Sequence, residues 1–160
     1  NLIAELKKGG KLIFIRHAYA PGIGDPDNFD IDNCDTQRNL SDVGREQAKK
    51  IGAFFKKNNI TVDEVYSSEW CRCKETAQIA FNKYEKKNFL NSFFSSRFFK
   101  NKESQMIKLK RFIYNHDNKK NIIFLTHYVV INETLNYSSN SGEIIVIDKN
   151  YNILGNLMTN

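Results

Sequence analysis

Three short polar segments of the sequence follow directly after apolar runs. They are Arg16-His17 after residues 12–15, Ser67-Ser68 with Arg72 after residues 62–66, and Thr126-His127 after residues 122–125. A guanidinium group presents planar pairs of donors that suit phosphate oxygens. A neutral imidazole has a nitrogen lone pair that can attack phosphorus, because its ordinary pKa is about 6.5. Two arginines and two histidines brought together would therefore form a pocket for a phosphoryl group.

Taken singly, these residues have more ordinary interpretations. A lone His17 or His127 would more often be a hydrogen-bonded histidine at a strand end, and Arg72 could cap or pair on a helix. The combination of all four favours the phosphate pocket. His116 lies in a polar turn and is interpreted as solvated, and Arg45 as a surface or structural residue.

The segments that must position these residues alternate between strand and helix patterns. The apolar runs predict buried strands at residues 11–15, 62–66 and 121–125, and the helical stripes predict helices at residues 41–57, 70–81 and 103–114. A short helix is expected before Gly9-Gly10, and residues 142–157 are expected to form a hairpin. In parallel α/β sheets ligands bind at the carboxyl ends of the strands, so the polar segments should meet at one edge.

Length and composition fit one compact domain over residues 1–160. The chain has a mass of 18.6 kDa, with 41% hydrophobic and 26% charged residues, which excludes a disordered chain and a fibrous repeat. No apolar run approaches the roughly 20 residues of a membrane-spanning helix, so no membrane span is predicted. The phenylalanines at positions 93, 94, 98 and 99 are interpreted as core or pocket wall. The oligomeric state stays open.

The net charge of +6 favours anionic partners. Most of the positive charge is lysine spread along the chain without interleaved aromatic residues, which indicates a solvated surface. A nucleic-acid binder is therefore kept only as a weak alternative, and no nucleic-acid partner is predicted.

The three cysteines do not indicate a metal site. Cys71 and Cys73 are spaced more tightly than a usual zinc pair, no fourth ligand is evident, and neither a metal nor a cofactor is predicted. Cys34 precedes Arg38 too closely for the signature of cysteine-dependent phosphatases. Either all three thiols are reduced, or Cys34 pairs with Cys71 or Cys73 in an oxidising compartment. Because the chain begins with Asn1, an exported or periplasmic protein that lost an N-terminal segment is one expectation, and a cytoplasmic location stays open.

Four ordered blocks of the sequence resemble the histidine phosphatase (phosphoglycerate mutase-like) superfamily, in its small single-domain bacterial branch. They are the pair Arg16-His17 after the first strand, the Leu-Ser-x-x-Gly-x-x-Gln-Ala pattern at residues 40–48, the Ser-x-x-x-Arg-x-x-x-Thr-Ala pattern at residues 68–77, and the Leu-Thr-His triplet at residues 125–127. The blocks span most of the chain.

The resemblance implies a fold and a chemistry. The expected fold is a three-layer α/β/α sandwich around a mostly parallel sheet. His17 is implied as the nucleophile that becomes phosphohistidine, while Arg16, Arg72 and His127 bind the phosphoryl group. The expected activity is that of a metal-independent phosphoric monoester hydrolase of the histidine acid phosphatase type. It would act on a phosphomonoester or phosphoramidate, carried by a small phosphorylated substrate or a phosphoprotein.

The sequence departs from the family pattern at two places. Residues 21–39 replace a shorter loop, resemble a subgroup often exported from bacteria, and contain Arg38 as a further candidate phosphate contact. The segment at residues 89–96, where many relatives carry a general acid, has no carboxylate. Asp25, Asp27 and Glu133 are the substitutes considered, with Asp25 preferred. A phosphatase is therefore favoured over a mutase, and an anion-binding pseudoenzyme of the same fold is the alternative.

Overall fold

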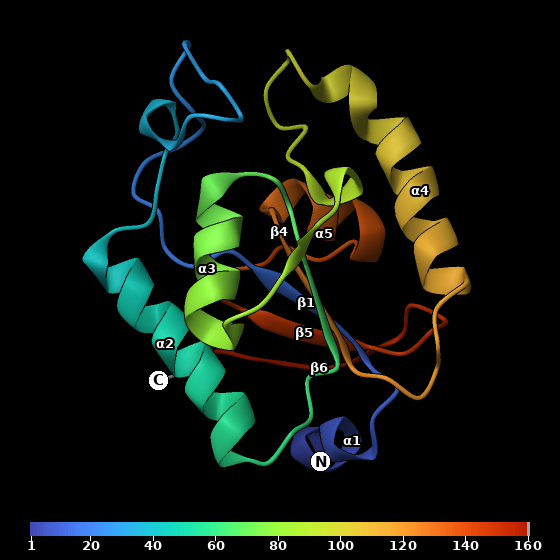
Figure 1. Cartoon of the computed structure of the whole chain (residues 1–160). Helices are drawn as coiled ribbons and strands as arrows, with labels where there is room; N and C mark the ends of the chain where they lie inside the picture. Colours follow the sequence, from blue (N-terminus) through green and yellow to red (C-terminus); the bar gives the residue numbers. More distant parts are fainter. Residues whose placement is uncertain (160) are drawn as a thin grey trace.

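A six-stranded sheet organises the computed structural model, which describes residues 1–159 (Figure 1). The strands lie in the order β3-β2-β4-β1-β5-β6. Their bounds are β1 Leu12–Arg16, β2 Glu64–Ser67, β3 Glu85–Lys86, β4 Ile122–Thr126, β5 Ile144–Ile147 and β6 Ile153–Leu157. The first four are mutually parallel, whereas β5 and β6 are antiparallel and form the predicted hairpin. The sheet is thus mostly parallel, as predicted.

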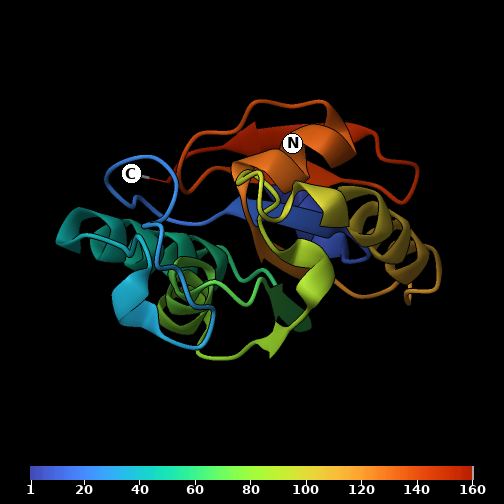
Figure 2. The same cartoon turned by 90° about the horizontal axis from the view of Figure 1, so that it is seen from above.

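Helices cover both faces of this sheet. Their bounds are α1 Leu2–Lys8, α2 Asp42–Lys57, α3 Cys71–Phe81, α4 Lys102–Tyr114 and α5 Tyr128–Leu135, with short 3₁₀ helices η1 Cys34–Thr36, η2 Asn88–Leu90 and η3 Phe99–Asn101. Seen from above, α2 and α3 are separated from α4 and α5 by β1 (Figure 2). This confirms the three-layer α/β/α sandwich. No helix within residues 1–159 is long and apolar enough to cross a bilayer.

The two cores follow from the alternation of side chains along the central strands. On β1, Leu12 and Phe14 pack with residues of α4 and α5, while Ile13 and Ile15 pack with residues of α1, α2 and α3. Because both faces are covered, β1 and β4 are continuous apolar runs rather than alternating ones. The polar residues that carry chemistry lie where these runs end.

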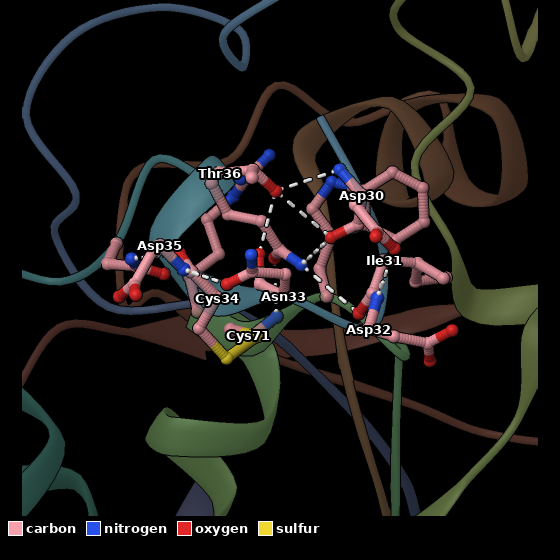
Figure 3. The surroundings of a disulfide bond; sticks show 12 residues. Asp30, Ile31, Asp32, Asn33, Cys34, Asp35, Thr36 and Cys71 are labelled. Carbon is pink, nitrogen blue, oxygen red and sulfur yellow. Dashed lines mark hydrogen bonds between the residues drawn. A yellow bond between two sulfur atoms is a disulfide. The ribbon is translucent and has the colours of Figure 1, made fainter. Parts of the chain in front are cut away.

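Two long segments rise from the carboxyl edge of the sheet. One joins β1 to α2 and the other joins β3 to α4, and both extend toward the top of Figure 1. The first is tied to the start of α3 by a disulfide between Cys34 and Cys71, whose Cα atoms lie 5.8 Å apart (Figure 3). Of the open alternatives the structure has this pairing, and Cys73 is a buried free thiol.

Candidate active site

His17 follows β1, and its ring is oriented by the backbone. The side chain is only 2% exposed, and Nδ1 lies 2.9 Å from the carbonyl oxygen of Ala18, so Nδ1 carries the proton and donates it there. Nε2 therefore keeps its lone pair and accepts a hydrogen bond from Nε of Arg72 at 3.3 Å. Burial, and then the charge of Arg72, hold the pKa of His17 well below its ordinary value. The imidazole is neutral and its unprotonated nitrogen faces a guanidinium group.

His127 lies beside His17 at the end of β4. The two ring centroids are 5.5 Å apart in an edge-on arrangement. Nε2 of His127 lies 2.8 Å from Oγ of Ser68, whereas its buried Nδ1 has no hydrogen-bond partner within the described residues. Burial, and then Arg72, also lower the pKa of His127 well below its ordinary value. Two neutral imidazoles thus share one site.

Arg72, on the first turn of α3, joins the two sides of the site. Its guanidinium is 3% exposed and donates from Nη1 to Oδ1 of Asp25 at 2.8 Å and from Nη2 to Oδ2 at 3.4 Å. Nη1 also reaches the carbonyl oxygen of Arg38 at 3.3 Å. The helix therefore presents a cation to His17 while an acidic residue from the segment after β1 fixes its orientation.

Arg16 approaches the same space from the last position of β1. Its Nη1 donates to the carbonyl oxygen of Ser139 at 2.8 Å, and its guanidinium carbon lies 5.4 Å from the centre of the Tyr128 ring. Its buried Nε has no partner within the described residues. Buried polar groups normally have partners, so Nε of Arg16 and Nδ1 of His127, both on residues that line one cavity, suit a ligand with several oxygens.

Asp25 and Arg38 support the site in different ways. Burial by itself raises the pKa of Asp25, but hydrogen bonds and charge from Arg72, with the backbone N–H of Arg38 and Nε1 of Trp70, hold it below its ordinary value. An ionised carboxylate of this kind is a poor proton donor at neutral pH, which disfavours the predicted role of general acid. Arg38 lines the cavity, yet Nε is bound to the carbonyl oxygen of Gly24 at 2.7 Å. Burial, then Arg72, lower the pKa of Arg38 to about 10.

The other candidates lie apart from the two histidines. Asp27 lines the cavity but is exposed, and Glu133 on α5 is paired with Lys102 at 3.4 Å outside it. Arg45 binds Glu75 on the surface, consistent with the interpretation of the sequence. Burial raises the pKa of Cys73 to about 12, so its thiol stays protonated at neutral pH.

The segment that carries His17 and Arg72 matches a known protein family. Residues 12–90 match the model of the histidine phosphatase superfamily, branch 1. The chain belongs to the histidine phosphatase superfamily. It is 37% identical over 87 residues to the mitochondrial serine/threonine-protein phosphatase Pgam5 of Drosophila grimshawi. The aligned region covers 53% of this chain but only 27% of that protein.

Solved structures of the superfamily share the fold. The protein histidine phosphatase SixA complexed with tungstate is 12% identical, with a TM-score of 0.63 over 93% of this chain and 96% of SixA. A phosphoglycerate mutase from Thermus thermophilus is 14% identical, with a TM-score of 0.62 over 94% of this chain and 99% of the mutase. At identities this low the likeness establishes the fold alone.

The second and third histidine phosphatase blocks fix the backbone that follows His17. Oγ1 of Thr76 on α3 accepts a hydrogen bond from the backbone N–H of Ala18 at 3.0 Å, and Oε1 of Gln47 on α2 accepts from that of Tyr19 at 2.9 Å. A Cβ atom at Gly44 would lie 2.0 Å from the carbonyl oxygen of Tyr19, so only glycine permits this approach. These polar positions hold the histidine-bearing strand end from two helices.

The cavity of this histidine phosphatase family member contains residues that the sequence did not identify. It measures about 480 Å³ and is lined by Arg97 and by Trp70, in addition to the four predicted residues. Arg97 donates to the carbonyl oxygen of Phe29 at 3.1 Å, and its guanidinium lies 4.9 Å from the centre of the Phe98 ring. The available signal was an arginine among four phenylalanines, between the predicted helices at residues 70–81 and 103–114.

Proposed function

We propose that this chain is a phosphatase that hydrolyses a phosphomonoester or phosphoramidate through a phosphohistidine on Nε2 of His17, without a metal. The observation that carries the proposal is the orientation of this ring. Because Nδ1 donates to the carbonyl oxygen of Ala18, the lone pair on Nε2 faces Nε of Arg72, and the ring of His127 lies 5.5 Å away between centroids. That nitrogen is the nucleophile available in the cavity.

Charge in the site favours the transfer of a phosphoryl group. In the transition state negative charge is spread over the equatorial oxygens, and fixed cations stabilise it. Arg16 and Arg72 supply guanidinium donors. Nδ1 of His127, unpartnered in the described residues, carries the ring proton when Nε2 accepts from Oγ of Ser68, and then supplies a further donor. Arg38 contributes positive charge from the cavity wall.

The two half-reactions balance without a cofactor. The P–O or P–N bond of the substrate breaks, its electron pair leaves with the departing group, and the lone pair of Nε2 forms an N–P bond. Water then attacks phosphorus and releases a proton, which balances the proton that the departing group takes from solvent. Inorganic phosphate departs, and the N–P electron pair returns to Nε2 of His17. Asp25, held ionised by Arg72, positions that guanidinium in both steps.

The compartment is part of the proposal. The Cys34–Cys71 disulfide supports an exported, oxidising location such as the periplasm, where such bonds persist. The substrate is then a small phosphorylated molecule or a phosphoprotein that reaches that compartment.

Trapping of labelled phosphate on the protein tests the nucleophile and the reaction class together. We expect acid-labile label on His17 after a short incubation with a labelled aryl phosphate, and steady turnover that survives a chelator. His17→Ala should remove both label and turnover, while His116→Ala, a matched histidine variant outside the cavity, should keep both. Label on His116 or on a cysteine would contradict the assignment.

A pseudoenzyme is the second candidate, because one observation favours it. The carboxylate of Asp25 engages two nitrogens of Arg72, the same donors that a phosphoryl group would need. If phosphate binds in a calorimeter while every phosphoester and phosphoramidate is left intact, the site is an anion-binding module.

A further inference from the structure

The half of the cavity beyond the histidines has aromatic walls. Phe29 stacks on Trp70 with ring centroids 4.8 Å apart, and Phe98 meets these two rings edge-on at 5.7 and 5.5 Å. The wall begins at the phosphoryl site itself, because the ring of Trp70 lies 5.4 Å from that of His127. A group attached to a phosphate bound there would contact aromatic surface.

Apolar side chains also surround the mouth of the cavity. Ile23 and Phe94 are 90% and 60% exposed, although both line the cavity. The two segments face each other, since a Cβ atom on Gly24 would lie 3.8 Å from the ring of Phe94. Exposed apolar residues that gather around a concave site are typical of ligand-binding grooves. The phosphoryl site therefore opens into a channel suited to an apolar group.

The volume of the cavity indicates how much ligand it holds. At about 480 Å³ it lies within the range of roughly 300–1,000 Å³ that accommodates whole small-molecule ligands. A phosphoryl group bound beside His17 and Arg72 fills only the inner end. The remaining space is bordered by the rings of Phe29, Phe94 and Phe98. Arg97 supports this wall, because it donates to the backbone carbonyl of Phe29 and lies over the ring of Phe98.

The carboxylates of the cavity are poor proton donors, so they favour leaving groups that can depart as anions. Among the described residues that line the cavity the carboxylates are Asp25, which is ionised against Arg72, and Asp27, which is exposed. An aliphatic alkoxide, whose conjugate acid is about as weak an acid as water, needs a proton donor in order to leave. A phenoxide has a conjugate acid with a pKa of about 10 and leaves far more readily.

From the aromatic wall, the cavity volume and the acid arrangement together, we infer that the site takes an aryl phosphate monoester, with its ring between Phe94 and the Phe29–Phe98 wall. This inference rests on the proposed phosphatase function. As Nε2 of His17 bonds to phosphorus, the aryl P–O bond breaks, the phenoxide leaves with the electron pair, and it takes a proton from water. The wall recognises the ring, and the inner cations recognise the phosphoryl group.

The affinities of phosphonates, which are not hydrolysed, measure recognition of the ring independently of the reaction. Phenylphosphonate should bind at least tenfold more tightly than methylphosphonate, measured by calorimetry. Phe94→Ala should weaken phenylphosphonate binding about tenfold while leaving methylphosphonate unchanged. Phe99→Ala is the matched control, because Phe99 is a similarly exposed phenylalanine outside the cavity lining, and it should change neither affinity. Equal affinity for the two phosphonates, or an unchanged Phe94→Ala variant, would overturn the inference.

Comparison of kcat/KM among three substrates distinguishes the effect of the aromatic ring from the effect of leaving-group acidity. We expect kcat/KM to fall from phenyl phosphate to benzyl phosphate, which has a ring but an alkoxide leaving group, and to fall again to butyl phosphate. A phosphotyrosyl peptide and free phosphotyrosine distinguish a protein source from a small-molecule source of the same chemistry. Preference for phosphohistidine over every aryl phosphate would overturn the inference. Loss of all turnover with phenylphosphonate binding retained would instead contradict the proposed phosphatase function and leave the subsite standing.

Discussion

Burial determines the protonation of both histidines in the site. It is the largest cause of the lowered pKa values of His17 and His127, and the charge of Arg72 is the second. A lowered pKa means that protonation, which would occupy the attacking lone pair, occurs only at pH values below the ordinary 6.5 of the side chain. The proposed nucleophile therefore stays available in mildly acidic solution.

The pH dependence of the imidazole signals tests this state. In NMR titrations of the ligand-free protein we expect the rings of His17 and His127 to remain neutral at pH 6.5 and to protonate below it. The acid limb of the kcat/KM profile should also have its midpoint below pH 6.5. The second ionisation of the substrate phosphate, near pH 6, contributes to the same limb and must be corrected for. Midpoints at or above 6.5 for both rings would contradict the burial argument.

Asp25→Asn distinguishes a positioning residue from a proton donor. Loss of the charged partner of Arg72 should lower kcat/KM about 10- to 100-fold, equivalent to the roughly 1.5–3 kcal/mol of a charge-assisted hydrogen bond. The factor should be the same for p-nitrophenyl phosphate and phenyl phosphate, because no proton moves from Asp25. A loss that grows as the leaving group worsens would show that Asp25 is the general acid. Asp27→Asn, at the exposed carboxylate of the same segment, is the matched control.

Residues at strand ends were easier to predict than residues on loops. Arg16, His17 and His127 converge because β1 and β4 are adjacent and parallel, so their carboxyl ends lie side by side. A polar residue at either end can therefore be placed in the site from the sequence alone. The environment of Asp25 depends instead on contacts with Arg38 and Trp70, 13 and 45 residues away, that no local pattern specifies. The roles of all these residues stay predictions until the phosphate is trapped.

At the scale of elements, α2 and α3 hold the strand end that carries His17. Gln47 and Thr76 accept hydrogen bonds from the backbone after His17, and the absence of a side chain at Gly44 lets α2 approach that backbone. The glycine of the family pattern is thus explained by packing: it lets the first turn of α2 touch the backbone of Tyr19.

Gly44→Ala should force α2 away from this backbone. We expect the free energy of unfolding to fall by about 1–3 kcal/mol, as for an overpacked core, and kcat to fall because the backbone after His17 shifts. Chemical denaturation and steady-state kinetics measure the two effects. Glu46→Ala, on the exposed side of the same helix, should stay within about 0.5 kcal/mol of the parent. An unperturbed Gly44→Ala variant would contradict the close contact.

Elements with strong periodicity or long apolar runs were predicted, and the exceptions have physical reasons. The helix at residues 41–57 was found because Ser41 caps it and one face is apolar. The helix α5 was not predicted: it has eight residues, no side-chain cap, and an apolar beginning that continues the run of β4. The two-residue strand β3 is formed by pairing with β2 and carries little signal of its own.

At the scale of the whole molecule, one covalent bond connects the segment after β1 to α3. Around it Thr36 donates to the carbonyl oxygens of Asp30 and Asn33, so the linked segment is also held by internal hydrogen bonds (Figure 3). Cys71 directly precedes Arg72, so the link also bears on the orientation of a residue in the site.

Removal of this link should destabilise the fold. A cross-link across 37 residues stabilises a protein by about 2–4 kcal/mol, so Cys34→Ala/Cys71→Ala should unfold at a lower temperature than the parent. A reducing agent should lower the melting temperature of the parent to that of the variant and leave the variant unchanged. If the reducing agent leaves the parent unchanged as well, the bond is absent in solution.

The chain has a single tryptophan, and the fold places it in the wall of the proposed phosphoryl site. Its indole N–H donates to Asp25 at 3.0 Å while its ring meets His127 edge-on. The tryptophan emission of this protein therefore comes from one chromophore in the proposed reaction centre. Titration with inorganic phosphate should change the intensity saturably, so that occupancy and its kinetics can be followed by stopped-flow fluorescence without any label.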